Sequence, residues 1–430
     1  MKILYMFVFT NLFCGCYNNL LRDDSDDFPP IIIENAAYYV ATDGNDNNPG
    51  TFNQPWATWQ KACTAAVAGD TVYIRGGIYY SSTEDEYGVY IYRKSGTYAH
   101  PICIFNYPGE FPILDCSTIT RSSDIIGIYL NRCNYIHLKG LTVKGVRQPT
   151  PNTDNSNGIS TENSSGIKFE NCISHSNGGS GFSAFQTDTI YYINCDSYDN
   201  FDRITAGYSG GQADGFVACF ASAKSYTYFR GCRSWYNSDD GFDCWENEGI
   251  VVFDNCWTFN NGRGDGDGGG FKLGRTVKQP LDVPQRILTN CAAIKNRFIG
   301  FNQNNGNVKM TLYNNIAYDN DDIGYDLSQY ENVMTVRNNI SYKNGKMGDF
   351  SESAIHDHNS WDSSPSVTIT DADFVSVDST GISGARQSNG SLPVIDFLRL
   401  AAGSDLINSG INVGLPFLGI APDLGPFEKD

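Results

Sequence analysis

Short strand-like segments rich in apolar residues recur through the middle of the chain, and each ends at a turn, as in "IKFENC", "VVFDNC" and "TLYNN". The last residue of each segment is taken as its anchor: Cys172, Cys195, Cys232, Cys256, Cys291, Asn315 and Asn339. Successive anchors lie 23 or 24 residues apart, except for two intervals of 37 and 35 residues. A repeat of this length, made of short strands and turns, predicts a solenoid in which each repeat forms one coil.

Fixed columns of residues accompany the anchors. The residue three positions before each anchor is apolar, the residue two positions after it is small, and the residue five positions after it is asparagine. The asparagines are Asn177, Asn200, Asn237, Asn261, Asn296, Asn320 and Asn344. Stacked asparagines need identical turns directly above one another, with each side-chain amide bonded to the next. Leucine-rich repeats would show a leucine ladder, and propeller repeats run to about 40–50 residues. The columns therefore predict an all-β fold, a right-handed parallel β-helix with an asparagine ladder.

The two ends of the β-helix are marked differently. Residues 56–69, "WATWQKACTAAVAG", have helical spacing and precede a strand-like segment. We expect a helix here that caps the first coil, because an open end of a solenoid is prone to aggregate. We expect residues 37–430 to form a single β-helix catalytic domain.

The N-terminus, "MKILYMFVFTNLFCGC", has one lysine and then an apolar run that ends in small residues. Such a stretch is a secretory signal rather than a membrane span. It resembles a bacterial lipoprotein signal over residues 1–16, in which Cys16 becomes the lipidated first residue; the alternative is plain secretion with cleavage nearby. We expect residues 17–36 to form an acidic, flexible tether. We therefore expect the domain on the extracellular side of a bacterial cell, anchored to the outer membrane or secreted.

The cysteine usage and the net charge argue against several kinds of site and binding partner. Without Cys14 and Cys16, eleven of the 13 cysteines remain, an odd number with no C-x-x-C pair. This is neither a disulfide framework nor a zinc site, so we expect the anchor cysteines to stack inside the coil as buried free thiols. The formal charge of −18 argues against nucleic acid or an anionic membrane surface as a partner. We expect a monomer that meets the membrane only through its lipid anchor. A polyanionic substrate would need a metal ion or a local basic patch.

A glycine–aromatic pair recurs in six of the repeats, and acidic residues gather beside two of the pairs. The pairs are Gly181-Phe182, Gly215-Phe216, Gly241-Phe242, Gly270-Phe271, Gly300-Phe301 and Gly324-Tyr325. Asp214 and Asp240 each lie two positions before the aromatic residue of successive coils. Asp243 and Lys272 each lie one position after the aromatic residue of their coil, and Asp239 directly precedes Asp240. Because neighbouring coils are about 4.8 Å apart, these side chains are predicted to meet. Most of the first insertion and about half of the second precede this segment.

Stacked carboxylates repel one another unless they are protonated or bridged by a cation. Four aspartates on a rigid sheet match calcium, which takes six to eight oxygen ligands. The alternative is that some of these aspartates only cap turns. Lys272 either forms a salt bridge with Asp243 or, with calcium neutralising the carboxylates, has a pKa lowered enough to act as a base.

Several other motifs are weaker. Residues 207–211 match G-x-S-x-G, but they lie between coils rather than on a strand-to-helix elbow. Gly264, Gly266 and Gly269 match G-x-G-x-x-G without a βαβ unit. Asp265 and Asp267 either bind a second cation or belong to a flexible turn. His356 and His358 flank Asp357 in what we expect to be a C-terminal loop, where a metal role is an alternative to a purely structural one.

The motifs "ADGF", "SDDGFDCW", "DNCWTFNNG" and "GGGFKLG", in register on an asparagine-laddered coil, resemble the family 9 polysaccharide lyases, pectate lyases among them. The resemblance covers most of residues 37–430. It implies calcium ligands at Asp214, Asp239, Asp240 and Asp243 and a Brønsted base at Lys272. The implied reaction is β-elimination at a 4-linked galacturonate of a pectic polysaccharide, either homogalacturonan or rhamnogalacturonan I. The loops 201–213 and 263–285 would shape its subsites.

Two other functions remain open on the same fold. A glycoside hydrolase would use two carboxylates without a metal, which leaves Lys272 unexplained. A non-catalytic surface protein that binds glycans would have no reason to align four aspartates beside a lysine.

Overall fold

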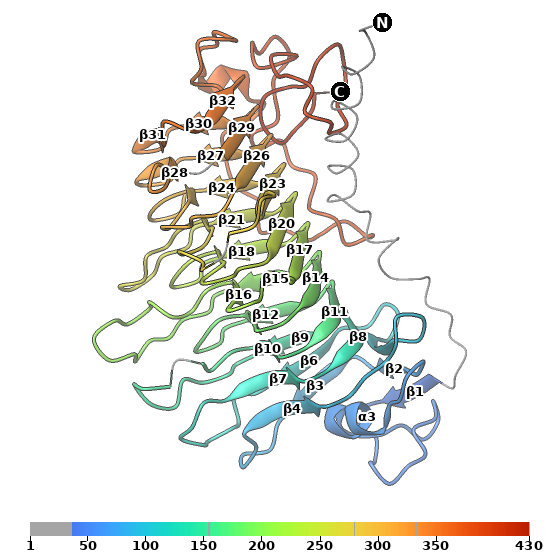
Figure 1. Ribbon diagram of the computed structural model, residues 1–430. Helices are drawn as coiled ribbons and strands as arrows, with labels where there is room; N and C mark the ends of the chain where they lie inside the picture. Colours follow the sequence, from blue (N-terminus) through green and yellow to red (C-terminus); the bar gives the residue numbers. More distant parts are fainter. Residues whose placement is uncertain (1–36, 154, 279, 332–333, 430) are drawn as a thin grey trace, which may run out of the picture.

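The computed structural model describes residues 37–153, 155–278, 280–331 and 334–429. The predicted signal peptide, the tether and Cys16 lie outside the described residues. Figure 1 shows the strands stacked coil upon coil along one axis, with β1 and α3 at one end and β32 near the other. Most coils contribute one strand to each of three parallel sheets. The prediction of an all-β, right-handed parallel β-helix is confirmed.

Sheet 1 has 12 strands: β1 (Ala37–Val40), β2 (Thr71–Ile74), β5 (Ile102–Asn106), β8 (Asn134–Lys139), β11 (Ser165–Glu170), β14 (Thr189–Ile193), β17 (Tyr226–Arg230), β20 (Ile250–Asp254), β23 (Arg286–Thr289), β26 (Met310–Tyr313), β29 (Met334–Arg337) and β32 (Ile355–Asp357). Sheet 2 has 10 strands: β3 (Gly77–Tyr80), β6 (Pro112–Asp115), β9 (Thr142–Lys144), β12 (Ile173–His175), β15 (Asp196–Tyr198), β18 (Arg233–Trp235), β21 (Trp257–Phe259), β24 (Ala292–Ile294), β27 (Ile316–Tyr318) and β30 (Ile340–Tyr342). Sheet 3 also has 10 strands: β4 (Tyr87–Tyr92), β7 (Ile126–Asn131), β10 (Ile159–Glu162), β13 (Phe182–Phe185), β16 (Phe216–Cys219), β19 (Phe242–Asp243), β22 (Phe271–Lys272), β25 (Phe301–Asn302), β28 (Ile323–Leu327) and β31 (Lys346–Phe350).

The capping helix α3 (Trp59–Ala65) is shorter than the segment that its spacing predicted. It begins after Thr58, whose hydroxyl accepts a hydrogen bond from the Lys61 N–H at 3.1 Å, a common N-cap. Trp56 is excluded from the helix because its backbone N–H bonds to Tyr39 at 2.9 Å and extends the first sheet. Trp59 and Ala62 pack into the same core as the first strands, so the helix covers the first coil as expected. No helix in the described ranges has the length and apolar character needed to cross a bilayer.

The interior of the coil is filled by ladders of identical side chains. The aromatic members of the glycine–aromatic pairs stack face to face, with centroids of successive rings 4.8–5.0 Å apart from Phe182 to Tyr325. Every cysteine in the described part of the chain is a buried free thiol, as predicted. The glycine of each pair packs closely against the next coil. A Cβ atom on Gly241 would lie 2.0 Å from the Thr258 hydroxyl oxygen, which leaves no room for a side chain there.

The asparagine ladder runs unbroken from Asn177 to Asn344, with each amide Nδ2 donating to the next Oδ1 at 2.8–3.0 Å. A second ladder, which the sequence columns did not predict, links Asn315, Asn339 and Asn359 at 2.9–3.0 Å and continues the cysteine stack. Both ladders lie at turns between sheets. They hold each turn directly above its neighbour, so the coils cannot slip in register.

The residue just before each anchor adopts a left-handed backbone. The φ angles here are between 52° and 62°, at Asn171, Asn194, Gly231, Asn255, Asn290, Asn314 and Asn338. Asparagine and glycine tolerate this conformation better than other residues do. The asparagine in "ENC" and "DNC" thus sets the corner between sheets 1 and 2.

The chain that follows β32 packs against the outer face of sheet 2. Phe374, Phe397 and Leu398 join Trp257 and Phe259 in a second apolar cluster. The segment includes the short 3-10 helix η1 (Asp371–Asp373). Figure 1 shows this last part of the chain, in red, beside the upper coils.

Candidate active site

The predicted site residues come from three successive coils of sheet 3. Asp214 precedes β16, Asp239 and Asp240 precede β19, and Lys272 ends β22. Asp243 on β19 pairs with Lys272 on β22, so the register predicted from the columns is present. The Asp240 backbone N–H donates to Asp214 Oδ1 at 3.0 Å, which joins the two aspartates that precede the strands.

Three of the carboxylates converge around the lysine. One oxygen from each of Asp214, Asp240 and Asp243 lies within 4.8 Å of the other two, and all three residues are buried. Lys272 Nζ is 2.9 Å from Asp240 Oδ2 and 3.1 Å from Asp243 Oδ2. The salt bridge considered for Asp243 therefore exists, and Asp240 shares it.

Asp239 takes a different position from the other three. Its Oδ1 accepts a hydrogen bond from the Asp267 backbone N–H at 2.8 Å, and it belongs to the wall of the same groove. The converging set of three oxygens does not include it. Asp239 is thus a neighbour of the cluster and is not one of its three converging members.

The electrostatics of the cluster are those of crowded buried acids. Burial and the neighbouring carboxylates raise the pKa values of Asp214 and Asp239, and burial raises the pKa of Asp243 despite Lys272. Burial alone would lower the pKa of Lys272, but the charges of Asp240, Asp243, Asp214 and Asp239 outweigh it and raise that pKa. With only these side chains, Lys272 is a charged ammonium. The lowered pKa expected of a base requires another positive charge among the carboxylates.

The donor set fits a hard cation. Asp243 Oδ1 is buried without a hydrogen-bond partner among the described residues, and so is Asp240 Oδ2 apart from its ion pair with Lys272. Buried carboxylate oxygens without donors are costly unless a positive charge compensates them. Carboxylate oxygens on a rigid sheet, next to an open groove that admits water, are the ligands that calcium takes.

A groove of about 930 Å³ runs over sheet 3 above the cluster. Tyr208 and Gln212 from the first insertion and Asp267 from the second form part of its wall, so both insertions shape it as expected. Trp245 also borders it, and its ring centroid lies 5.3 Å from Lys272 Nζ and 4.1 Å from Arg275 Cζ. Trp245 is in the motif "SDDGFDCW", yet nothing in the sequence columns assigned it a place at the site.

The weaker motifs do not form sites of their own. Ser209 in the G-x-S-x-G match donates its hydroxyl to the Arg203 carbonyl at 2.7 Å, in a loop without an adjoining helix. Asp267 accepts a hydrogen bond from the Tyr208 hydroxyl at 2.9 Å and faces the groove. No cluster of possible metal ligands in the described residues includes Asp265 or Asp267.

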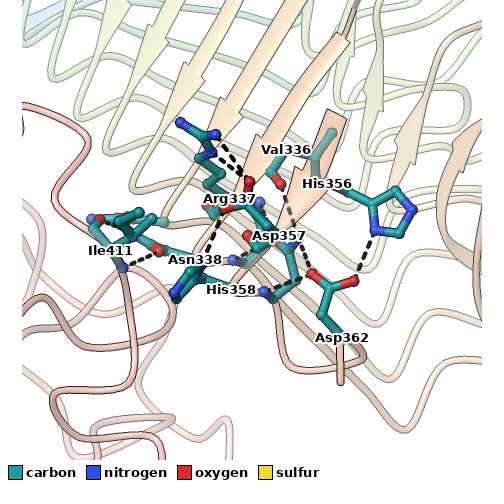
Figure 2. A network of polar contacts seen from close by, with 11 residues as sticks. Val336, Arg337, Asn338, His356, Asp357, His358, Asp362 and Ile411 are labelled. Carbon is teal, nitrogen blue, oxygen red and sulfur yellow. Dashed lines mark hydrogen bonds and ion pairs between the residues drawn. The ribbon is translucent and has the colours of Figure 1, made fainter. Parts of the chain in front are cut away.

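One of the two C-terminal histidines, His356, also differs from expectation. His356 lies on strand β32, not in a loop, because β32 pairs with β29. Its Nδ1 is 2.8 Å from Asp362 Oδ1, and His358 Nδ1 is 3.1 Å from Asp357 Oδ1 (Figure 2). Arg337 also binds Asp357, at 2.9 Å. This network lies at the last strand of sheet 1. The set of converging ligand oxygens found among the described residues is the one at Asp214, Asp240 and Asp243.

Known proteins share both the fold and the length of this chain. The model of the family described as "Pel9A-like, right handed beta helix region" matches residues 38–359. A protein named pectate lyase L from Dickeya dadantii is 31% identical, and the alignment covers 100% of each chain.

Two solved structures are similar as well. The crystal structure of pectate lyase Pel9A has a TM-score of 0.79 and 30% identity, and covers 95% of this chain and 100% of its own. A structure named rhamnogalacturonan lyase has a TM-score of 0.76 and 28% identity, with 86% and 97% covered. The β-helix, the register of its coils and these similarities agree: the chain belongs to the Pel9A-like right-handed β-helix family and is a polysaccharide lyase.

Proposed function

We propose that the protein is a calcium-dependent lyase that cleaves 4-linked galacturonate in pectic backbones. The observation that carries the proposal is the contact of Lys272 Nζ with two carboxylates of a buried three-aspartate cluster beside an open groove. The relatives named pectate lyase and rhamnogalacturonan lyase support the choice of a pectic substrate.

Asp214, Asp240 and Asp243 would hold the calcium ion, with Asp239 as the fourth ligand. Calcium bound there would balance the charge of the substrate carboxylate and so make the neighbouring C5–H more acidic. The same ion resolves the charge problem of an acidic protein that binds an acidic polymer.

Lys272 is the proposed Brønsted base. Its neutral amine takes the proton from C5, the electron pair of that bond forms the C4–C5 double bond, and the sugar oxygen on C4 leaves. The product is a 4,5-unsaturated uronate at a new chain end. Because a neutral lysine is required, we expect an alkaline pH optimum.

A rate measurement on two polymers tests this proposal. Homogalacturonan and rhamnogalacturonan I are digested, and the ultraviolet absorbance of unsaturated products is followed. Lys272→Ala should abolish turnover, whereas Lys346→Ala, a matched change of an exposed lysine on the same sheet, should leave it intact. Turnover that survives in Lys272→Ala would refute Lys272 as the base.

The products also separate the other classes of function. A hydrolase would release saturated sugars, and its two carboxylates would stand about 5–9.5 Å apart. Here three carboxylate oxygens lie within 4.8 Å of one another with the lysine bound between two of them, which favours a lyase. A glycan-binding protein without activity would release nothing from either polymer.

We also propose that Cys16 carries a lipid that holds the monomeric enzyme on the extracellular side of a bacterial membrane. The support is the sequence "LFCGC" at the end of an apolar run. Incorporation of labelled fatty acid into the full chain, and its loss in Cys16→Ser, would test the anchor.

A further inference from the structure

The groove above the lysine extends far beyond the cluster of aspartates. Its other end lies over β4, β7 and β10, strands that precede the asparagine ladder. Tyr129 on β7 pairs with Ser160, and the same column continues through Ser183 and Val217 to Asp243 and Lys272. Lys272 is five strands from Tyr129, so the two side chains are about 24 Å apart along the axis. Between Tyr129 and Lys272, the short side chains of Ser160, Ser183 and Val217 form the floor of the groove.

Tyrosines form a platform at this far end, made of Tyr87, Tyr90 and Tyr129. The Tyr129 ring centroid lies 5.1 Å from that of Tyr87 and 5.4 Å from that of Tyr90. All three rings are half-buried, and Tyr87 and Tyr129 line the groove. The Tyr129 ring stacks on that of Tyr90 at an interplanar angle of 23° and is tilted by 45° to that of Tyr87. Tyrosine rings at a groove offer an apolar face together with hydroxyl groups at the edge.

Carboxylates surround the tyrosine platform. Glu162 accepts hydrogen bonds from the Tyr129 hydroxyl and from Asn131 Nδ2, and Glu86 accepts one from the Tyr87 hydroxyl at 3.1 Å. Along the whole groove, Lys272 is the only basic residue among the described lining residues. The acidic ones are Glu86, Asp124, Glu162, Asp214, Asp239, Asp243 and Asp267.

A uronate unit could not occupy this end favourably. Its carboxylate would lie beside Glu86 and Glu162, with no basic side chain among the described lining residues nearer than Lys272. An uncharged sugar meets no such repulsion. It can place its apolar face on the tyrosine rings and donate its hydroxyls to the carboxylates, as sugars and other polar ligands do in aromatic clefts.

We propose that the tyrosine platform is a subsite for an uncharged sugar, and that the enzyme prefers a pectic chain in which neutral sugars interrupt the uronates over a continuous polyuronate. This inference rests on the proposed function of the site at Lys272. It adds the substrate class: the backbone that alternates rhamnose and galacturonate, rather than homogalacturonan.

The test compares kcat/KM on the two polymers for the full chain and its variants. Wild type should favour the alternating polymer. Glu162→Gln keeps the shape and one acceptor oxygen but removes one negative charge, so kcat/KM on homogalacturonan should rise about threefold relative to kcat/KM on the alternating polymer. Glu352→Gln, an exposed acid near the other end of the β-helix, is the control and should change neither. Tyr129→Ala should lower kcat/KM on the alternating polymer by roughly tenfold. Thermal unfolding of each variant shows that it is folded.

Three results would overturn the proposal. One is a wild-type preference for homogalacturonan, and another is an equal effect of Glu162→Gln on both polymers. The third is a change in the calcium concentration that Glu162→Gln needs for activity, because the acids would then form a second cation site.

Binding measurements separate this subsite from the proposed chemistry. Oligosaccharides of both polymers are titrated into Lys272→Ala and into Lys272→Ala with Glu162→Gln. Selective binding of the alternating oligosaccharide without elimination by the wild type would leave the subsite intact and refute the proposed function. Elimination by the wild type with no selectivity in binding would do the reverse.

Discussion

Arg286 offers a test of how the β-helix holds Lys272, the proposed base, in place. Among the residues that the structure describes, Arg286 is the largest fully buried side chain, and no carboxylate there forms an ion pair with it. Its guanidinium donates instead to four carbonyls: Leu273 at 2.7 Å, Asn247 at 2.6 Å, Gly249 at 2.9 Å and Gln285 at 2.8 Å. Leu273 directly follows Lys272, and Asn247 follows Trp245 by two residues. Arg286 therefore holds both chain segments that border the lysine.

The cost of removing this arginine follows from its four acceptors. Arg286→Met leaves the carbonyl oxygens of Leu273, Asn247 and Gly249 without this donor, at about 1–3 kcal/mol for each one that stays unsatisfied. The Gln285 carbonyl keeps its hydrogen bond from the Val251 N–H at 2.9 Å. Rearrangement and water will satisfy some of them, so we expect the free energy of unfolding to fall by about 4 kcal/mol. Arg286→Lys keeps the charge but offers three donors in place of a planar fork, and should lose about half as much.

Activity should respond more than stability does in Arg286→Lys. A shift of about 1 Å in a reacting group can cost about a hundredfold in rate. We expect kcat to fall at least tenfold with little change in KM, because the groove that binds substrate stays intact. Denaturant unfolding and steady-state rates on the same preparations measure both. Wild-type kcat in a destabilised Arg286→Lys would refute a positioning role, and an unchanged unfolding free energy in Arg286→Met would refute the hydrogen-bond argument.

The remaining predictions concern the metal, the ladder and acid stability. Chelation should abolish activity and added calcium should restore it, whereas Asp243→Asn should stay inactive at any calcium concentration; full activity in chelator would contradict the proposed site. Asn237→Ala, in the middle of the ladder, breaks bonds to Asn200 and Asn261 and should lower the free energy of unfolding by about 2–4 kcal/mol in a denaturant titration. Burial lowers the pKa of His137 to about 4 from its ordinary 6.5, despite the Glu170 carboxylate at 3.0 Å. The unfolded chain then binds the extra proton between these pH values, so stability should fall by up to about 3 kcal/mol as pH drops from 6.5 to 4. His137→Gln should flatten that pH dependence, and an unchanged slope would rule this histidine out as its source.

The register of the site was predictable because glycine–aromatic pairs recur beside it in successive coils. Once Phe216, Phe242 and Phe271 are stacked, the positions of Asp214, Asp240 and Lys272 relative to one another follow by counting residues from these rings. A hydrogen bond between Asp240 and Asp214 and an ion pair between Lys272 and Asp240 are what such stacking produces.

The far end of the groove was not predictable in the same way. The ladder begins at Asn177, whose Oδ1 accepts a hydrogen bond from the backbone of Val146 at 3.2 Å. In the equivalent turn of the earlier coil, Val146 stands where the later coils have asparagine. With no marker in that column, the sequence does not align Tyr129 with Lys272, although backbone pairing does.

Contacts across the insertions were missed for another reason. Arg286 lies beyond the loop 263–285, whose length hides which coil it faces. A lone arginine in "VPQRILTN" reads as a surface charge, because nothing nearby in sequence is its partner. Its acceptors are backbone carbonyls, and any residue type supplies those.

The ion pair between Lys272 and its two aspartates explains why the proposed chemistry needs a cation. The carboxylates that would bind calcium are the ones that raise the pKa of Lys272 and keep it protonated. If their charge is balanced, burial is the influence that remains, and burial lowers the pKa of a lysine. In the proposed mechanism, Lys272 would therefore act as a base only when its acidic neighbours have another partner. The same aspartates would then control both where the substrate carboxylate binds and when the amine is free to take a proton, so the two requirements of the proposed elimination would be met together.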